Sequence, residues 1–180
     1  MFHHSHFEVI SGCDETLKRM NRKYTIQEFE HGVNLLRAKF PSAALTTDII
    51  VGFPGETEKE FNTTYDFLKR IKFAKMHIFK YSQRKGTVAA KMKDQIDPKI
   101  KDERSNKLIE LSNKNEEEFL DRFIGKKLEV LFETTVHDGY TEGHTTNYIN
   151  VKAKGTNIEN TIKTVEVAKR VGLELYGNII

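Results

Sequence analysis

Apolar residues recur with two alternating periods along residues 1–122, and this alternation predicts a layered α/β fold. Residues 6–10 form a short run typical of a strand. Residues 45–52 are nearly all apolar or β-branched, which is the pattern of a strand buried on both faces. Residues 76–81 predict a third strand, so strand and helix patterns follow one another as in parallel βαβ units.

Helix start signals stand between the predicted strands. Asp14 is predicted to cap a short helix after the first strand. Thr25 with Glu28, and Thr57 with Glu60, each match a capping box. Apolar stripes at helical spacing follow these two boxes: Phe29, Val33, Leu36 and Phe40 in one helix, and Phe61, Tyr65, Leu68 and Ile71 in the other.

A long charged helix is predicted over residues 98–122, with Pro98 at its start. From Phe123 onward the pattern changes to short β-rich runs separated by Gly, Asn and Asp, at residues 128–135, 140–146, 148–153, 161–167 and 174–177. The Asp138-Gly139 pair is a hairpin signal. We therefore expect residues 1–122 to form one domain and residues 123–180 to form a small antiparallel, OB-like β-barrel.

Composition narrows the class of protein. Hydrophobic residues make up 38% of the chain and charged residues 31%, as in a soluble globular protein. No apolar run is long enough to span a bilayer, and no basic-then-apolar leader opens the chain, so we expect a cytoplasmic protein without a membrane partner. The net charge is only +3, so any nucleic-acid-binding patch must come from local arrangement.

Cys13 is the single cysteine. This excludes a disulfide framework and any cysteine-ligated cluster or zinc site made by this chain alone. His3, His4 and His6 gather near the start, and two histidines spaced by one residue on a strand point the same way. His4 and His6 could share a metal, but no third ligand is evident, so we predict no metal site and favour ordinary strand positions.

Residues 47–57 carry the sharpest chemical signal. In a parallel α/β sheet ligands bind beyond the carboxyl ends of the strands, where the glycine-containing turn at residues 52–56 would lie. Glycine allows a ligand to approach the backbone, and the next helix offers free N–H groups. The alternative is a tight turn that needs Gly and Pro for geometry alone.

Basic and aromatic residues mark three further candidates. Arg19, Arg22 and Lys23 fall within one helical turn and could meet a phosphate or carboxylate, unless they are only a surface face. Residues 80–87 suit an anionic or nucleobase ligand, or form an ordinary surface loop. On the C-terminal strands aromatic and basic residues alternate and could bind RNA, or could serve as core: Lys126, Lys127, Phe132, Tyr140, Tyr148, Lys152 and Lys154.

Three segments in order resemble radical-SAM tRNA methylthiotransferases. They are SGCDETLKRMNRKYT (residues 11–25), TTDIIVGFPGET (residues 46–57) and FKYSQRKGTVAA (residues 79–90). The last sixty residues are similar to the TRAM domain that ends those enzymes, including Gly143, Asn147-Tyr148 and residues 175–177. Residues 13–16 and 75–79 are most similar to the branch that acts on threonylcarbamoyladenosine.

The resemblance implies the C-terminal part of a radical-SAM, partial TIM-type barrel followed by a TRAM barrel. It implies S-adenosylmethionine (SAM) and 4Fe–4S clusters as cofactors, tRNA as partner, and a methylthio group added to a hypermodified adenosine beside the anticodon. The residues that would inherit contacts to SAM or its adenine are Ser11, Arg22, Asp48, Gly52, Pro54, Gly55, Glu56 and Tyr81.

The chain departs from the family at several points. It lacks the CxxxCxxC loop that holds the SAM-cleaving cluster, and Ile10 stands where the family has Gln. We therefore expect the chain to be inactive alone, with the N-terminal half of the enzyme as its missing partner. Two alternatives stay open: a standalone RNA-binding module without catalysis, and a structural α/β domain with an unrelated small-molecule site at the 52–56 turn.

Overall fold

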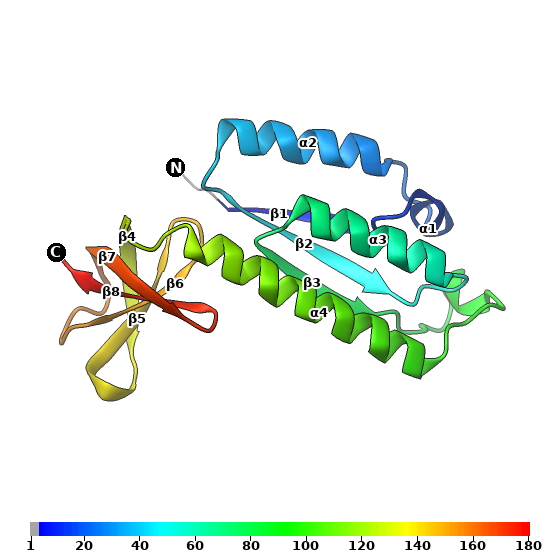
Figure 1. The fold of residues 1–180 in the computed structure, drawn as a ribbon. Helices are drawn as coiled ribbons and strands as arrows, with labels where there is room; N and C mark the ends of the chain where they lie inside the picture. The colour runs from blue at the N-terminus through cyan, green and yellow to red at the C-terminus, as the bar shows by residue number, and fades with distance from the viewer. Residues whose placement is uncertain (1–3) are drawn as a thin grey trace. The chain divides into compact units, whose positions relative to one another are not determined.

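The structure, a computed structural model, describes residues 4–180, apart from the His137 side chain, and divides them into two compact units (Figure 1). One unit holds residues 5–41 and 45–115, and the other holds His4, residues 42–44 and residues 116–180. His3, one of the candidate metal ligands, lies outside the described residues. No helix of the described chain is long and apolar enough to cross a membrane.

The first unit is an α/β layer. Its sheet contains β1 (His4–Ile10), β2 (Ala44–Val51) and β3 (Lys75–Lys80) in the order β1-β2-β3, and β2 pairs with β3 in parallel. The helices are α1 (Asp14–Arg19), α2 (Ile26–Lys39), α3 (Glu58–Ile71) and α4 (Pro98–Asp121), with a 3₁₀ turn, η1, at Ala89–Lys91. The predicted partial α/β barrel is confirmed at the level of α/β content.

Local sequence signals correctly predicted where α2 and α3 begin. Thr25 with Glu28 and Thr57 with Glu60 form complete capping boxes, as predicted. The prediction that Asp14 caps α1 is wrong, because Cys13 is the N-cap residue and makes no side-chain cap bond. Asp14 Oδ1 instead accepts a hydrogen bond from the N–H of Ile26 at 2.8 Å, so it satisfies a free donor at the start of α2.

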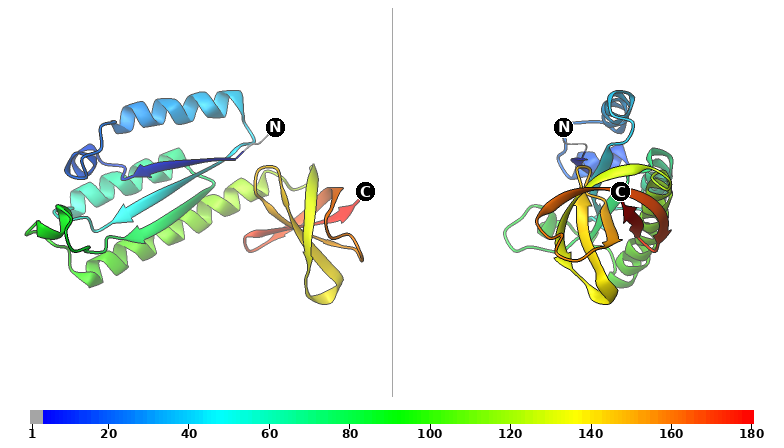
Figure 2. Two further views of the ribbon diagram at one scale, coloured as in Figure 1. Left: turned by 180° about the vertical axis from the view of Figure 1, so that it is seen from behind. Right: turned by 90° about the vertical axis from the view of Figure 1, so that its left-hand side faces the viewer.

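One face of the sheet is covered and the other is open. The odd-numbered residues of β2 are buried beneath the helices, whereas Asp48 and Ile50 are only half-buried. Seen from behind, the strands lie in front of α3 (Figure 2). The prediction that residues 45–52 are buried on both faces therefore fails at Asp48 and Ile50 and holds for the other six residues, because a run of β-branched residues reads alike whether one face is covered fully or in part.

Aromatic and aliphatic side chains fill the space between sheet and helices. Phe73, Leu68 and Leu17 are at most 1% exposed. The Phe29 ring lies 6.2 Å from Phe73 and 6.5 Å from Phe67, centroid to centroid. Each such side chain stabilises the fold by about 1.5–3 kcal/mol relative to an exposed position.

The second unit is a closed barrel with strand order β4-β5-β6-β8-β7. Its strands are β4 (Lys127–Thr135), β5 (Tyr140–Thr145), β6 (Asn150–Lys154), β7 (Thr161–Val171) and β8 (Glu174–Ile179). The prediction of a purely antiparallel barrel is wrong at one pair, since β6 and β8 run parallel. Strand directions cannot alternate around a closed ring with an odd number of strands, so one neighbouring pair must be parallel.

Turns and glycines let the barrel close. Asp138 and Gly139, in the short 3₁₀ turn η2 (His137–Gly139), have φ of 63° and 73°, as the hairpin signal predicted. A Cβ on Gly143 would fall against the Leu131 carbonyl oxygen of the neighbouring strand. Only glycine permits this close approach of strands.

Candidate SAM edge and candidate RNA face

The turn between β2 and α3 lies at the carboxyl edge of the sheet, as predicted (Figure 1). Gly52 and Gly55 have φ of 71° and 80°, values that favour glycine. A Cβ on Gly52 would collide with the Lys101 side chain, and one on Gly55 would lie 3.3 Å from Arg19 Nε. The space beside these two glycines is therefore occupied by the side chains of Lys101 and Arg19.

Glu56 is an internal anchor of the same turn. It is 5% exposed, and its Oε1 accepts hydrogen bonds from Arg104 Nη1 at 2.6 Å and from the Gly52 N–H at 3.1 Å. Burial raises the pKa of Glu56, although the Gly52 N–H and the Arg104 guanidinium oppose this effect. The carboxylate therefore fastens the turn to α4 and faces the interior of this unit.

Tyr81 follows β3 at the same edge. Its ring packs edge-on against Phe53 with the centroids 5.3 Å apart, and Lys101 Nζ lies 5.4 Å from its centroid. Within the described chain its buried hydroxyl has no hydrogen-bond partner. Because a buried unpaired hydroxyl is costly, this atom is the clearest point at which a ligand could be recognised.

The remaining residues predicted for the SAM site lie in different surroundings. Pro54 is buried within the turn, and Arg22 is exposed in the segment after α1. Ser11 is 1% exposed, and its Oγ lies 3.2 Å from Thr64 Oγ1 of α3. Ser11 thus faces the helix layer at the end of β1.

Asp48 lies away from the turn, on the open face of the sheet. Its Oδ1 is 3.3 Å from His6 Nε2 of β1, and His77 of β3 is its register partner. The sequence pattern singles out His6 but not His77. The alternation in β3 carried the signal, because Met76 is buried and its neighbour must then face the open side.

The donor set for an iron–sulfur cluster is a poor fit. Cys13 is the one cysteine of the sequence, is buried, and its Sγ donates a hydrogen bond to Glu15 Oε2 at 3.0 Å. Burial and this bond raise the pKa of the thiol. A 4Fe–4S cluster needs several thiolates, so the described residues do not provide its ligands.

A basic and aromatic face lies on the outside of the barrel. Tyr140 of β5 packs edge-on against Tyr176 of β8 at 5.5 Å between centroids. Lys154 Nζ lies 5.6 Å from the Tyr140 ring, and Lys169 Nζ lies 5.9 Å from the Tyr176 ring. We call these four residues the tyrosine–lysine face; sequence reasoning named only Tyr140 and Lys154, because Tyr176 and Lys169 become neighbours only when the strands pair.

The other residues predicted for RNA are placed less favourably. Lys152 lies between two carboxylates, 2.8 Å from Glu174 Oε1 and 3.8 Å from Glu142 Oε2, and the hydrogen bond to Glu174 raises its pKa. Its charge is thus largely neutralised. Tyr148 is 68% exposed, in the loop before β6.

Two basic residues stand at the start of β4. Lys126 and Lys127 are exposed, and Lys126 Nζ lies 5.6 Å from the Phe123 ring. The predicted core alternative holds for Phe132, which is fully buried. Among the residues predicted to bind RNA, Tyr140 and Lys154 are in contact with each other.

Comparison with known sequences relates this chain to enzymes that modify tRNA. Residues 3–68 match the radical SAM superfamily. The chain is 45% identical over 172 residues to a probable threonylcarbamoyladenosine tRNA methylthiotransferase of Methanocaldococcus jannaschii, covering 94% of this chain and 38% of that protein. It is 44% identical over 157 residues to the threonylcarbamoyladenosine tRNA methylthiotransferase MtaB of Bacillus subtilis, covering 85% and 35%.

The relatives include a second substrate class. A tRNA-2-methylthio-N(6)-dimethylallyladenosine synthase of Acetivibrio thermocellus is 41% identical over 174 residues, covering 89% of this chain and 36% of that protein. Among solved structures, the radical SAM enzyme coproporphyrinogen III oxidase of Escherichia coli matches with a TM-score of 0.55 and 16% identity, over 94% of this chain and 41% of that one. This last likeness concerns the fold alone, and the chain spans little more than a third of the three tRNA-modifying relatives.

Proposed function

Because this chain belongs to the radical-SAM tRNA methylthiotransferases, we propose that it is part of an enzyme that adds a methylthio group to threonylcarbamoyladenosine beside the anticodon of tRNA. The observation that carries this proposal is the 45% identity over 172 residues to a relative of that name. Relatives named for dimethylallyladenosine are 41% identical over 174 residues and 48% identical over a shorter stretch of 130 residues, so it is the identity over the longer alignments that favours threonylcarbamoyladenosine. We further propose that the protein works in the cytoplasm.

In this proposal the α/β unit contacts SAM and the barrel binds tRNA. The carboxyl edge of the sheet, with the unpaired Tyr81 hydroxyl and the 52–56 turn, forms part of the wall beside SAM. The barrel, which we propose to be a TRAM domain, binds tRNA through the tyrosine–lysine face. The cluster that starts radical chemistry is held by cysteines outside this sequence, in the N-terminal part of the enzyme, so the chain alone does not catalyse the reaction.

Direct binding tests the RNA part of the proposal. Titration of a fluorescently labelled tRNA that carries threonylcarbamoyladenosine should give saturable binding by the full chain at low salt, weakening as salt rises. Tyr140→Ala removes a stacking platform worth about 1–3 kcal/mol, a loss of roughly 5- to 150-fold in affinity. Lys154→Ala should reduce the steepness of the salt dependence by about one counterion.

The matched control is Lys69→Ala, which removes an exposed lysine of α3 and should leave tRNA affinity unchanged. Binding that is insensitive to both barrel variants would contradict the tyrosine–lysine face as the RNA site. If the chain binds tRNA through this face but does not bind SAM in calorimetry, the standalone RNA-binding module becomes the better description.

Anaerobic incubation with iron and sulfide tests the proposed inactivity. We expect no stable 4Fe–4S absorption, since one hydrogen-bonded thiol cannot hold a cluster that takes its ligands from several cysteines. A stoichiometric, stable cluster on this chain would overturn the proposal.

A further inference from the structure

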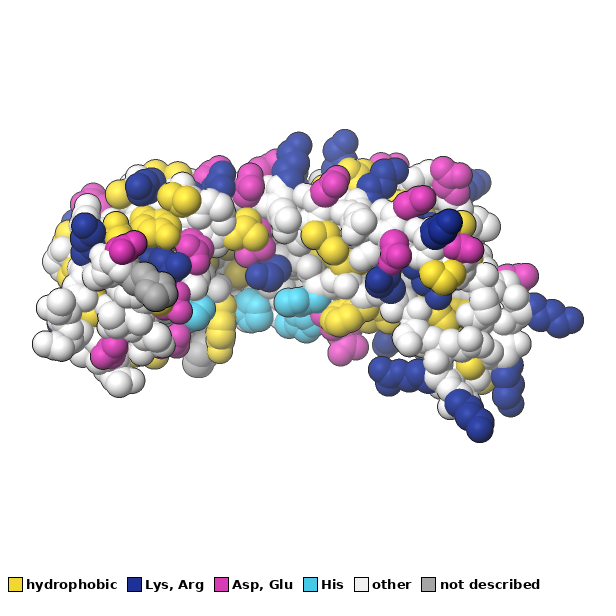
Figure 3. All heavy atoms as spheres, turned by 90° about the horizontal axis from the view of Figure 1, so that it is seen from below, with side chains coloured by type: hydrophobic (Ala, Val, Ile, Leu, Met, Phe, Trp, Pro, Cys, Tyr) yellow, Lys and Arg dark blue, Asp and Glu magenta, His cyan; other side chains and the backbone are white. Residues whose placement is uncertain are grey.

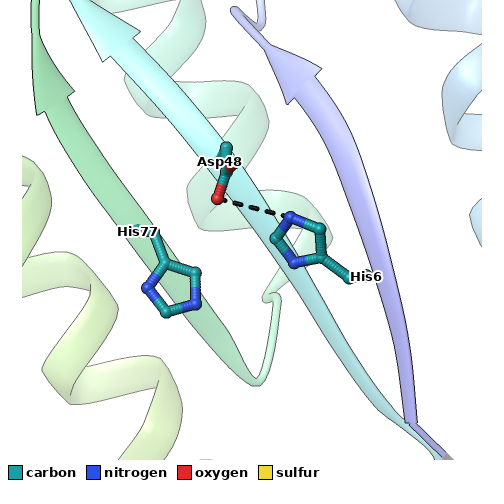
Figure 4. Close-up of side chains that lie close together, drawn as sticks. All are labelled: His6, Asp48 and His77. Atoms are coloured by element: carbon teal, nitrogen blue, oxygen red, sulfur yellow. Dashed lines mark ion pairs between the residues drawn. The ribbon is translucent and has the colours of Figure 1, made fainter.

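Three metal-ligating side chains meet on the open face of the sheet, outside the carboxyl edge. His6, Asp48 and His77 come from β1, β2 and β3, and each offers a ligand atom within 4.8 Å of the other two (Figure 4). His6 Nε2 and Asp48 Oδ1 are 3.3 Å apart, and the two imidazole rings lie 5.9 Å apart, centroid to centroid. Strands far apart in sequence thus bring together a set that the sequence pattern did not suggest.

The spacing suits a cation. Two ligands bound tetrahedrally at about 2.0–2.1 Å from a zinc ion lie roughly 3.3–3.4 Å from each other. The pair formed by His6 Nε2 and Asp48 Oδ1 already has this separation. His77 is exposed, so its ring can rotate toward the same point without displacing the core. Histidine side chains are visible together at the surface in Figure 3.

His6 is oriented as a metal ligand would be. Its Nδ1 lies 2.9 Å from Thr46 Oγ1, a hydroxyl of the neighbouring strand that is itself 6% exposed. Metal binding at Nε2 requires the proton of the neutral imidazole to sit on Nδ1, and a hydrogen-bond acceptor beside Nδ1 stabilises that tautomer. The Thr46 hydroxyl can act as this acceptor, and its position beside Nδ1 orients the ring.

The donor set selects the class of ion. Two imidazoles with one carboxylate suit Zn²⁺, Co²⁺ or Fe²⁺, whereas Mg²⁺ and Ca²⁺ prefer oxygen ligands alone. Three protein ligands leave at least one coordination position open, as in catalytic rather than structural sites. Here that position faces the uncovered side of the sheet, where a small ligand can reach it.

We propose that His6, Asp48 and His77 bind one divalent transition-metal ion on the open face of the sheet. The site is distinct from any iron–sulfur cluster, because it contains no thiol and Cys13 is buried with its Sγ bonded to Glu15. The proposal does not rest on the proposed tRNA modification, since metal binding by these three side chains is measured without SAM or RNA.

Cobalt and zinc titrations of the full chain test the proposal. Isothermal calorimetry with Zn²⁺ should show one site per chain, and Co²⁺ should produce d–d absorption bands in the visible that Zn²⁺ then displaces. His77→Phe and Asp48→Asn each remove a ligand while conserving shape, and we expect each to weaken binding at least tenfold. Thr46→Val removes the acceptor beside Nδ1 and should weaken it by about 10- to 100-fold.

Two controls test three histidines outside the proposed site. His31→Gln changes an exposed histidine on α2, and the double variant His3→Gln/His4→Gln changes those near the start; both should bind metal as the parent does. Circular dichroism checks that every variant is folded. Affinity within threefold of the parent in folded His77→Phe and Asp48→Asn, or absence of binding to the parent at 100-fold excess of metal, would overturn the proposal and leave His6 and Asp48 as a simple ion pair.

Discussion

Glu60 of α3 both caps its own helix and binds Arg19 of α1. Its carboxylate completes the capping box with Thr57, and its two oxygens accept hydrogen bonds from Arg19 Nη1 and Nη2, each at 2.8 Å. The Arg19 guanidinium is the main reason that the pKa of Glu60 lies below its ordinary value. Such a two-bond pair is stronger and more specific than a single contact, and it ties the end of α1 to the start of α3.

Replacing this carboxylate by an amide should destabilise the fold. Glu60→Gln keeps the capping geometry but loses the charge, and we expect the free energy of unfolding to fall by about 1–2 kcal/mol at pH 7. Because the folded-state pKa is lowered, the stabilisation is complete above the ordinary glutamate value and disappears as pH falls through the folded-state value. Urea unfolding of parent and variant should therefore converge only at pH values below the folded-state pKa, which itself lies below the ordinary glutamate value of about 4.3.

The control is Glu58→Gln, which removes an exposed charge from the same first turn. It should change the unfolding free energy by less than about 0.5 kcal/mol. Equal effects of the two variants at pH 7 would show that Glu60 acts only through the helix dipole.

Ile10 has a backbone conformation that is unusual for its residue type. It has φ of 60° and is 5% exposed, and the N–H of Ser11 donates to the Val9 carbonyl across it at 2.6 Å. A β-branched residue in the left-handed region carries strain of about 1–2 kcal/mol. The strain belongs to the sharp turn at the end of β1.

At the scale of the element, α3 ends at a residue, Lys72, whose backbone conformation is unfavourable for a side chain with a Cβ atom. Lys72 adopts a left-handed conformation with φ of 53° and ψ of 65°, and its N–H still bonds to the Leu68 carbonyl. This geometry suits glycine, which carries no Cβ penalty.

Lys72→Gly should therefore stabilise the protein by about 0.5–1 kcal/mol, whereas Lys69→Gly inside the same helix should destabilise it by about 1 kcal/mol. The opposite signs follow from backbone conformation, since both lysines are exposed. Thermal unfolding of the two variants under identical conditions is the measurement. Destabilisation by both would show that the Lys72 side chain contributes more than its backbone costs.

At the scale of the whole molecule, the chain has two hydrophobic cores. Phe73 and Leu68 lie in the α/β unit, whereas Phe132 and Val130 are fully buried in the barrel. Closure of the barrel removes the exposed strand edges that an open sheet of this size would present. Each unit therefore has a buried core of its own.

Phe132→Ala should loosen the barrel selectively. Removal of a fully buried phenylalanine costs about 3–5 kcal/mol, and we expect amide hydrogen exchange to accelerate across residues 127–179. Exchange in residues 45–71 should stay as in the parent. Equal acceleration in both regions would show that the two units unfold as one.

Local sequence signals by themselves determined much of this protein. The capping boxes at Thr25 and Thr57 and the Asp138-Gly139 turn were predictable because the groups that form them lie within a few residues of one another. The order of three motifs was sufficient to indicate the family, since motifs are linear and need no knowledge of packing.

Tertiary structure decided the parts that depend on distant neighbours. Glu56 became an internal anchor only because Arg104 reaches it from α4, and His77 joined His6 and Asp48 only through strand pairing. The parallel pair of β6 and β8 follows from closing an odd-stranded ring. Burial, pairing and charge neutralisation arise between residues far apart in sequence, so a single sequence names the candidate side chains, and the fold determines which of them meet.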